Sequence, residues 1–488
     1  MARVLITSLG VGPGYADKEE LRKREYKKAD YVFQNSSQVY TTPFIADALS
    51  KHLQVDKIFM LGTNKSMWED AYRYFSRADQ DEEKQNIYFH IAEKIGEKET
   101  ASTLAEEDLQ ILNIALDQYL QEANPTASGG SLCKIIQYGK NDREILENFK
   151  IFMDLQKKIQ EGDEIYLDIT HSFRSIPLFM YLMIDFIQTL RKKDHIRVSG
   201  IYYGMFEAKD KTTGYVPVVD LSPLFELTQW TKGIYEFTNY GNVDLLVQLL
   251  DDGKIKDTMK NISDLANLNF IKEMRSQIDQ LRALLETEDE DKKQSVMFTY
   301  VKPKIKEFAD FFKGIDSDAK FQFRLAEWYF QNGRYANCLI CLTESMITQV
   351  IYIANKMGAK FDYRKPVHRR IFTEILLDEI MKRMVDPDFQ KIGELFFEIK
   401  RVRNDAAHAG FLENHRYQDV LEKLNGFVRK INHLFFSPEM EKKLRILLEK
   451  VDNEKLEKLY HARRNRDPQY QQMLEEIISN LNQEFVHN

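Results

Sequence analysis

The sequence predicts an α/β Rossmann-like domain at the N-terminus followed by an all-α region at the C-terminus. In the first part of the chain, apolar strand-like runs alternate with helical patterns, which is typical of a parallel sheet with helices on both faces. Beyond about residue 222 the strand-like runs stop, and helical periodicity continues almost to the end. A chain of 488 residues is also too long for one ordinary core, so two or more domains are expected.

The N-terminal elements follow from local patterns of apolar residues. Helical periodicity is clearest at 145–159 and 178–190. Ligands of such sheets bind beyond the carboxyl ends of the strands, near a switch in strand order. The expected strands are 4–9, 31–33, 57–61, 132–138, 165–169 and 198–203.

Charge and cysteine content limit the function classes. The chain has 69 Lys and Arg against 76 Asp and Glu, a net charge of −7. This acidic balance argues against a broad duplex-binding surface, so no specific DNA binding is expected, but it leaves room for a local basic cleft that holds single-stranded RNA. No run approaches the length of a membrane span, and the N-terminus reads as a strand rather than a signal peptide. Three cysteines give no disulfide framework, which favours a reducing cytoplasm.

Two of these cysteines, Cys338 and Cys341, form a lone C-x-x-C in an apolar helical stretch. A structural zinc site needs a second pair of ligands, and the sequence offers none. We therefore expect both thiols to be buried as small apolar side chains, and no metal site is predicted.

The polar loop Thr170–Pro177 lies between an apolar strand and an apolar helix. Free backbone N–H groups and the helix dipole both favour an anion at such a point. Thr170, Ser172 and Arg174 can add side-chain donors, whereas His171 can either contact a ligand or brace the loop. The alternative is a capped strand–helix turn that binds nothing.

A glycine-rich loop, Gly10–Gly14, follows the first strand. Its spacing differs from that of a dinucleotide fingerprint, Pro13 interrupts it, and no acidic residue ends the second strand. NAD is therefore not expected. Glycines at this point instead let the backbone approach another nucleotide phosphate.

In the helical region, Arg403 and Asn404 precede His408 after an apolar helical stretch. Histidine can move protons at a ribose 2′-hydroxyl or at the leaving oxygen, and arginine can stabilise the charge that builds on the phosphate. These residues can therefore cut RNA without a metal. Taken alone the pattern is weak, because an Arg and a His at this spacing are often two solvated charges.

The two parts together resemble the CARF–HEPN ribonucleases of type III CRISPR systems. The stretch Leu167–Pro177 is similar to the family's D-x-T-H-G-F-R-S-x-P signature, with Ser172 where glycine is usual. Ile201–Gly204 and Pro217–Leu221, followed by Trp230, are similar to the end of the same domain. The run from Arg403 to His408 is similar to the R-(N/H)-x-x-x-H motif of HEPN domains, and Glu344 matches an acidic position common in that fold.

The resemblance implies a CARF domain that binds a cyclic oligoadenylate across a two-fold dimer axis and so activates a composite HEPN ribonuclease. It implies cyclic tetra-adenylate as activator, with cyclic hexa-adenylate as the alternative, and a homodimer; whether the dimer forms a higher oligomer stays open. The substrate would be single-stranded RNA, with 2′,3′-cyclic phosphate and 5′-hydroxyl products. The implied catalytic residues are Arg403, Asn404 and His408. The implied ligand-binding residues are Ser8, Gly10, Gly12, Gly14, Thr170, His171, Ser172, Phe173, Arg174, Tyr203 and Gly204.

The expected domains are a CARF domain at 1–230, a helical linker region at 231–319, an HEPN domain at 320–436 and a helical extension at 437–488. A charged run at 286–293 is expected to be a solvated linker, and 438–488 a long terminal helix or helical pair. Three other functions stay open. The chain could be a toxin-like HEPN ribonuclease whose Rossmann domain serves only for dimerisation. It could be a ligand-sensing regulator without nuclease activity. It could also be an enzyme that cleaves the ligand in its own CARF pocket.

Overall fold

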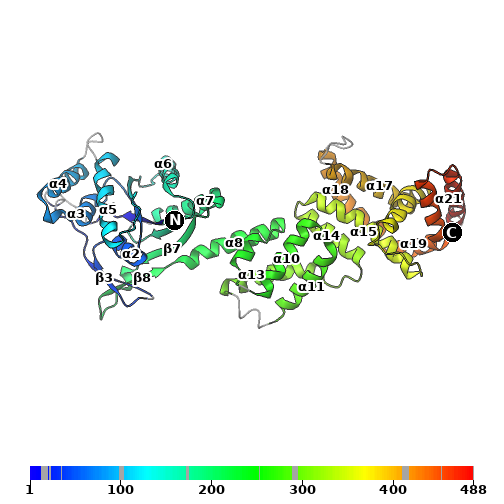
Figure 1. Cartoon of the computed structure of the whole chain (residues 1–488), viewed down its shortest axis with the longest axis horizontal. Coiled ribbons are helices and arrows are strands. Elements are labelled where there is room, and N and C mark those ends of the chain that lie inside the picture. Colours follow the sequence, from blue (N-terminus) through cyan, green and yellow to red (C-terminus); the bar gives the residue numbers. More distant parts are fainter. Residues whose placement is uncertain are drawn as a thin grey trace. The chain divides into compact units, whose positions relative to one another are not determined.

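The computed structural model of the chain describes residues 1–12, 20, 23–34, 36–97, 104–171, 175–251, 253–287, 295–408, 417–451 and 453–486. The chain divides into two compact units, Met1–Glu226 and Leu227–Asn488 (Figure 1). Strands are found only in the first of these units among the described residues, whereas the second is helical. An α/β N-terminal part followed by an all-α part was predicted, and this fold class is confirmed.

The N-terminal unit is built on one sheet with eight strands among the described residues, in the order β3-β2-β8-β7-β6-β1-β4-β5. The central strand β1 pairs in parallel with β4 on one side and with β6 on the other. The strands are β1 Arg3–Leu9, β2 Ala29–Phe33, β3 Val39–Thr42, β4 Lys57–Gly62, β5 Leu132–Ile135, β6 Glu164–Asp168, β7 Arg197–Gly204 and β8 Tyr215–Asp220.

Two features of the sheet differ from the prediction. The sheet is mixed rather than parallel, because β3 runs antiparallel to β2 and β8 runs antiparallel to β7. Both antiparallel strands were missed as elements of the sheet. β3 is only four residues long, and β8 contains Pro217, which reads as a strand breaker. Proline is tolerated there because β8 pairs with only the last residues of β7, from Val218 onward, so that Pro217 lies just outside that ladder.

Helices cover both faces of this sheet, as the sequence predicts. Apolar side chains alternate along β1: Leu5 packs into the core under α2 to α5, whereas Val4 and Ile6 pack into the core under α6 and α7. A strand buried on both faces reads as a continuous apolar run, which is why β1 was found from sequence. The helices are α2 Ile45–Leu53, α3 Trp68–Ser76, α4 Glu82–Gly96, α5 Gln110–Ala123, α6 Asp142–Leu155 and α7 Ser175–Leu190.

The C-terminal unit consists of helices around one large apolar core. Two segments, Ile371–Ile380 and Ile431–Phe435, are π-helical. The helices, beginning with one that spans the boundary between the units, are α8 Ser222–Tyr240, α9 Asp244–Leu249, α10 Lys254–Leu268, α11 Ile271–Leu285, α13 Val296–Phe311, α14 Asp318–Gln331, α15 Tyr335–Lys356, α16 Pro366–Arg370, α17 Pro387–Ala407, α18 Tyr417–Lys430, α19 Pro438–Lys450, α20 Asn453–Arg464 and α21 Tyr470–Val486.

Four of these helices form a closed bundle. α14 packs against α15, α15 against α17, α17 against α18, and α18 against α14 again. Helix α15 packs between α14 and α17 in this bundle. It is long and apolar enough to cross a membrane by length and composition, so the expectation that no run reaches that length was wrong, but most of it is buried inside the unit. Cys338 and Cys341 on this helix are buried free thiols, as predicted.

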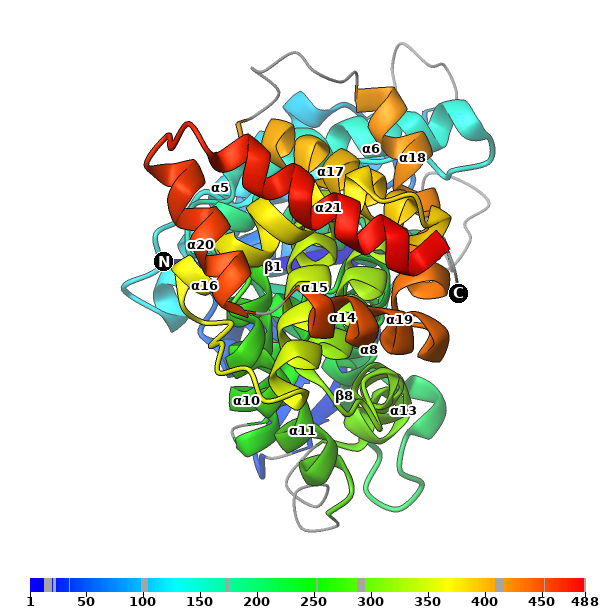
Figure 2. The ribbon, with the colours of Figure 1, turned by 90° about the vertical axis from the view of Figure 1, so that its right-hand side faces the viewer.

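The end of the chain forms three helices rather than the predicted long helix or helical pair. Figure 2 looks onto the last of them, α21, which crosses the view in red. Phe485 of α21 contacts Phe389 of α17 at a ring-centroid distance of 5.3 Å. The terminal helices therefore pack onto the bundle. Most of the predicted linker at 286–293 lies outside the described residues.

Candidate functional site

A cavity of about 340 Å³ lies where β1, β4 and β6 end. β1 lies between β4 and β6 in the sheet, and the chain forms β4 and β5 on one side of β1 before it returns to form β6 on the other. This is the switch in strand order at which open α/β sheets bind their ligands. The cavity is lined by Ser8, Leu9, Gly10, Val11, Gly12, Tyr26, Leu61, Gly62, Thr63, Ile136, Thr170, His171 and Ile176.

The loop after β1 depends on glycine. Gly12 has a φ of +62°, and a Cβ at this position would lie 2.0 Å from the sulfur of Met67. Gly10 is tight as well, because a Cβ there would lie 3.0 Å from the hydroxyl of Tyr26. These two glycines therefore let the backbone fit beneath Tyr26 and Met67 in a left-handed turn.

The loop after β6 is organised by the buried carboxylate of Asp168. One of its oxygens accepts from the Thr7 hydroxyl at 2.6 Å, and the other accepts from the Thr170 N–H at 2.9 Å. The Thr170 hydroxyl oxygen in turn accepts from the N–H of Gly204 at 2.9 Å. Thr170 therefore ties the end of β7 to this loop, and its hydroxyl hydrogen is the donor left for a ligand.

Two buried polar atoms of the cavity lining have no hydrogen-bond partner among the described residues: the Ser8 hydroxyl oxygen and the Nε2 of His171. The His171 ring lies 5.4 Å from that of Tyr26 and 5.6 Å from that of Phe206, measured between centroids. Burial lowers the pKa of His171, against the opposing charge of Asp168, so the ring is neutral near pH 7. Unpaired buried polar groups are costly, and a ligand that bonds to them removes the cost.

The structure brings together some of the predicted ligand-binding residues. Ser8, Gly10, Gly12, Thr170 and His171 line the cavity. Tyr203 and Gly204 do not line it: the Tyr203 hydroxyl donates to Glu207, and Gly204 packs behind Thr170. The predicted residues Gly14, Ser172, Phe173 and Arg174 lie outside the described residues.

Sequence reasoning missed Tyr26 and the β4 loop, of which Thr63 and Gly62 line the cavity. The β4 loop carried a usable signal, because Gly62, Thr63 and Asn64 follow a buried strand at the same edge of the sheet. Tyr26 gave no signal, since it precedes β2 in a stretch without periodicity and reaches the cavity only through the fold.

The second candidate site lies at the carboxyl end of α17. This helix begins at a capped proline: the Asp386 side chain accepts from the N–H groups of Asp388 and Phe389, and Pro387 occupies the first turn. It ends at Ala407, and the N–H of His408 still donates to the Asn404 carbonyl at 2.9 Å. The negative end of the helix dipole therefore lies beside the predicted catalytic residues.

The three predicted catalytic residues differ in exposure. Arg403 and Asn404 are half-buried, and His408 is exposed. Burial lowers the pKa of the Arg403 guanidinium, which nevertheless stays charged near neutral pH. Arg403 forms no ion pair with any carboxylate that the structure describes. A half-buried cation in this state favours an anionic ligand.

Glu344, the acidic residue that resembles a common HEPN position, pairs with Arg369 on α16. Arg369 also donates to the Tyr363 carbonyl at 3.1 Å, and burial lowers its pKa to about 10. The pair joins α15 to the segment that precedes α17, so its role in the structure is to hold helices together. Among the described residues, no group of three or more His, Cys, Asp or Glu side chains could hold a metal ion.

Comparisons with known proteins agree with this division of the chain. Residues 4–207 match the family model of the CARF domain of the CRISPR system endoribonuclease Csx1. Residues 226–317 match the model of the second domain of the CRISPR-associated protein MJ1674.

The full-length MJ1674 protein of Methanocaldococcus jannaschii is 37% identical over 462 residues, which cover 93% of this chain and 69% of that protein. Among solved structures, Enterococcus italicus Csm6 bound to cyclic hexa-2′-fluoro-hexa-dAMP covers 98% of this chain and 100% of its own, with 12% identity and a TM-score of 0.38. That score is too low to carry a conclusion. The identity and coverage of the MJ1674 relative, together with the Csx1 domain match, show that this chain belongs to the Csx1-like family of CARF-containing CRISPR-associated proteins.

Proposed function

We propose that the protein is a cyclic oligoadenylate-activated, metal-independent endoribonuclease that cuts single-stranded RNA in type III CRISPR antiviral defence in the cytoplasm. One observation carries this proposal. The same chain has a cavity with unpaired buried polar atoms at a sheet switch point, and a helix end with Arg403, Asn404 and His408. The first suits a regulatory nucleotide, and the second suits RNA cleavage by an HEPN-type site.

The cavity supports a nucleotide ligand by its chemistry. Its volume of about 340 Å³ is at the lower end of the range for small-molecule sites, so one copy would hold only part of a cyclic oligoadenylate. The unpaired Ser8 hydroxyl and His171 Nε2 offer hydrogen bonds to a base or a ribose. Two copies of the cavity on a two-fold axis would bind a ring with an even number of nucleotides by identical half-contacts. We favour cyclic tetra-adenylate, with cyclic hexa-adenylate as the alternative.

The surface of α7 supports the homodimer on which this proposal depends. Four large apolar side chains spaced by four residues, Leu178, Leu182, Phe186 and Leu190, are 62%, 53%, 41% and 55% exposed. Spacing by four places them along one side of the helix. The helix begins at Ser175, a short distance along the sequence from Thr170 and His171. A second copy that covers this stripe would therefore bring the two ligand cavities toward the same axis.

The chemistry proposed for the helix end uses the RNA's own 2′-hydroxyl as nucleophile. His408, or its counterpart in the second copy, takes the 2′-hydroxyl proton as the 2′-oxygen bonds to phosphorus. The bond from phosphorus to the 5′-oxygen breaks, and that oxygen takes its proton from the imidazolium formed in the first step. Arg403 stabilises the charge on the phosphate oxygens, and Asn404 positions the strand by hydrogen bonds. The products are a 2′,3′-cyclic phosphate and a 5′-hydroxyl.

The experiment is cleavage of a fluorescent single-stranded RNA reporter by three variants in the presence of activator. His408→Ala should abolish cleavage, and Arg403→Ala should reduce the rate by about 10²-fold or more. The matched control is Arg401→Ala, an exposed arginine on the same helix that should retain most activity. Chelator should have no effect. Wild-type-like cleavage by His408→Ala would refute the site, and ligand binding without any cleavage in wild-type protein would favour a ligand-sensing regulator.

A further inference from the structure

A buried ion pair lies beside the cavity in the N-terminal unit. Arg24 donates from Nε and Nη2 to the same oxygen of Glu69, at 3.0 and 2.7 Å. The two side chains are only 3% and 0% exposed. Burial raises the pKa of Glu69 to about 7, even though Arg24 opposes the shift. Burying two charges costs more free energy than their attraction usually returns, so stabilisation of the fold does not by itself explain a pair at this position.

The third bond of Arg24 suggests that role. Its Nη1 donates to the Val11 carbonyl at 2.9 Å, and Val11 lies in the glycine-rich loop after β1. Glu69, on α3, fixes the guanidinium plane by two bonds, so the direction of the third bond is fixed as well. The pair therefore anchors the loop to α3.

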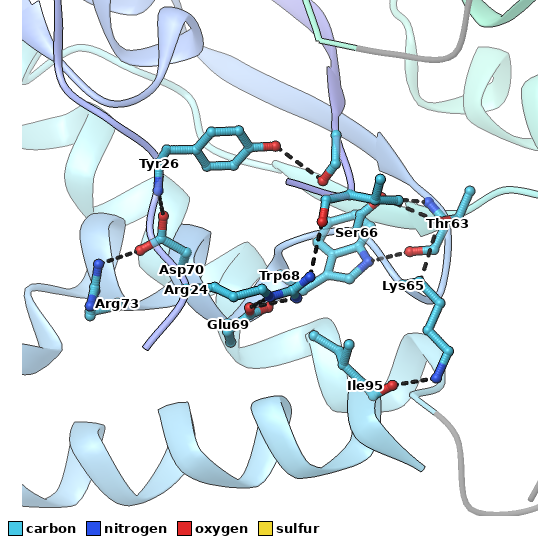
Figure 3. A network of polar contacts seen from close by, with 12 residues as sticks. Arg24, Tyr26, Thr63, Lys65, Ser66, Trp68, Glu69, Asp70, Arg73 and Ile95 are labelled. Carbon is cyan, nitrogen blue, oxygen red and sulfur yellow. Dashed lines mark hydrogen bonds and ion pairs between the residues drawn. The ribbon is translucent and has the colours of Figure 1, made fainter. Parts of the chain in front are cut away.

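Neighbouring carbonyls of the loop are held as well, by residues of the network around Arg24 and Glu69; Figure 3 labels Tyr26 and Ser66 among them. The Leu9 carbonyl accepts from the Ser66 hydroxyl at 2.7 Å. The Gly10 carbonyl accepts from the Tyr26 hydroxyl and from the Met67 N–H, both at 3.0 Å. Three consecutive carbonyls, Leu9 to Val11, are thus each bonded to a residue outside the loop.

Fixing a carbonyl also fixes an N–H group, because the two point in opposite directions in a planar trans peptide unit. The three held carbonyls belong to the peptide units whose N–H groups come from Gly10, Val11 and Gly12. None of these N–H groups donates to a residue that the structure describes. Successive free N–H groups of this kind bind the oxygens of anions, and this loop lines the cavity.

We propose that the Arg24–Glu69 pair is a positioning device: it sets the peptide planes of the Leu9–Gly12 loop so that its N–H groups are ready to receive a phosphate of the regulatory nucleotide. This inference rests on the proposed ligand function of the cavity. Arg24 and Glu69 act through the loop, and neither needs to touch the ligand.

Arg24→Lys tests the device, because lysine keeps the positive charge but lacks the fork that bonds Glu69 and Val11 together. The matched control is Arg73→Met, which removes another arginine of this network, bonded to Asp70 at 2.6 Å but to no loop carbonyl that the structure describes. Glu69→Gln keeps an oxygen that accepts from Arg24 and should have an effect of less than threefold.

Two measurements separate this inference from the proposed function. Without ligand, hydrogen exchange of the Met67 amide reports the loop, because that amide donates to the Gly10 carbonyl. We expect exchange to be several-fold faster in Arg24→Lys and unchanged in Arg73→Met. Calorimetry with cyclic tetra-adenylate should then show about tenfold weaker binding for Arg24→Lys and a change within twofold for Arg73→Met.

Each outcome decides the question. Unchanged exchange of the Met67 amide in Arg24→Lys would refute the positioning role of the pair, whatever the affinity for cyclic tetra-adenylate. Faster exchange with wild-type affinity shows that the loop is anchored but that the anchor does not serve the ligand, which also overturns the proposal. If wild-type protein binds neither cyclic tetra-adenylate nor cyclic hexa-adenylate, the proposed function fails, and faster exchange in Arg24→Lys would then support the anchor alone.

Discussion

Gly12→Ala should destabilise the N-terminal unit by two separable effects. The left-handed φ of +62° costs an alanine about 1–2 kcal/mol. The new Cβ would also lie 2.0 Å from the sulfur of Met67, a fully buried side chain, and forced overpacking of this kind costs about 1–3 kcal/mol. Together they predict a loss of about 2–5 kcal/mol in the free energy of unfolding.

Gly130→Ala is the matched control. Gly130 has a φ of +94°, but a Cβ there would meet nothing within 4 Å. It should therefore show the backbone cost without the clash. Urea denaturation followed by tryptophan fluorescence measures both variants, since Trp68, the one tryptophan of residues 1–226, is buried next to Met67. Equal losses in the two variants would refute the packing of Met67 against this loop.

Three further predictions concern charge, assembly and ligand affinity. Because burial raises the pKa of Glu69 from 4.5 to about 7, the protonated carboxyl stabilises the folded state below pH 4.5, and this contribution is lost as the pH rises to about 7. Glu69→Gln should therefore lose less stability than wild type across that window in urea titrations, and an unchanged pH dependence would contradict the shift. Leu182→Glu should dissociate the proposed dimer in analytical ultracentrifugation, whereas Leu268→Glu, at a position 66% exposed on α10, should leave it intact. Thr170→Ala should weaken binding of the activator about three- to tenfold, without lowering the maximal cleavage rate at saturation, because the coupling is between separate sites. Unchanged affinity of Thr170→Ala in calorimetry would show that Thr170 does not contribute to the ligand site.

Much of the sheet could be predicted because it is buried on both faces. Leu5, Ile58 and Ile165 lie in apolar runs, and such runs mark strands without any tertiary knowledge. The short strand β3 and the proline-containing β8 lack that signal, because they lie where pairing rather than burial defines the strand. Their antiparallel direction depends on connections that periodicity does not encode.

The cavity shows the same limit for the candidate site. The loops that follow β1 and β6 were predicted from glycine and polar residues at strand ends, and Gly12 and His171 line the cavity. Tyr26 and Arg24 could not be found, since they come from a stretch without periodicity and reach the loop only by contacts with Gly10 and Val11. Bonds between distant residues follow from the fold, which local patterns do not specify.

We propose that a nucleotide in the N-terminal cavity controls RNA cleavage at the end of α17. The most direct test adds cyclic tri-, tetra- and hexa-adenylate singly to wild-type protein and to His408→Ala, with a fluorescent RNA reporter and chelator present. We predict cleavage by wild type at the lowest concentration with cyclic tetra-adenylate, more activator needed with cyclic hexa-adenylate, and no cleavage by His408→Ala with any ring. Equal cleavage with and without every ring would refute control by the cavity, and cleavage by His408→Ala would refute the site at the end of α17.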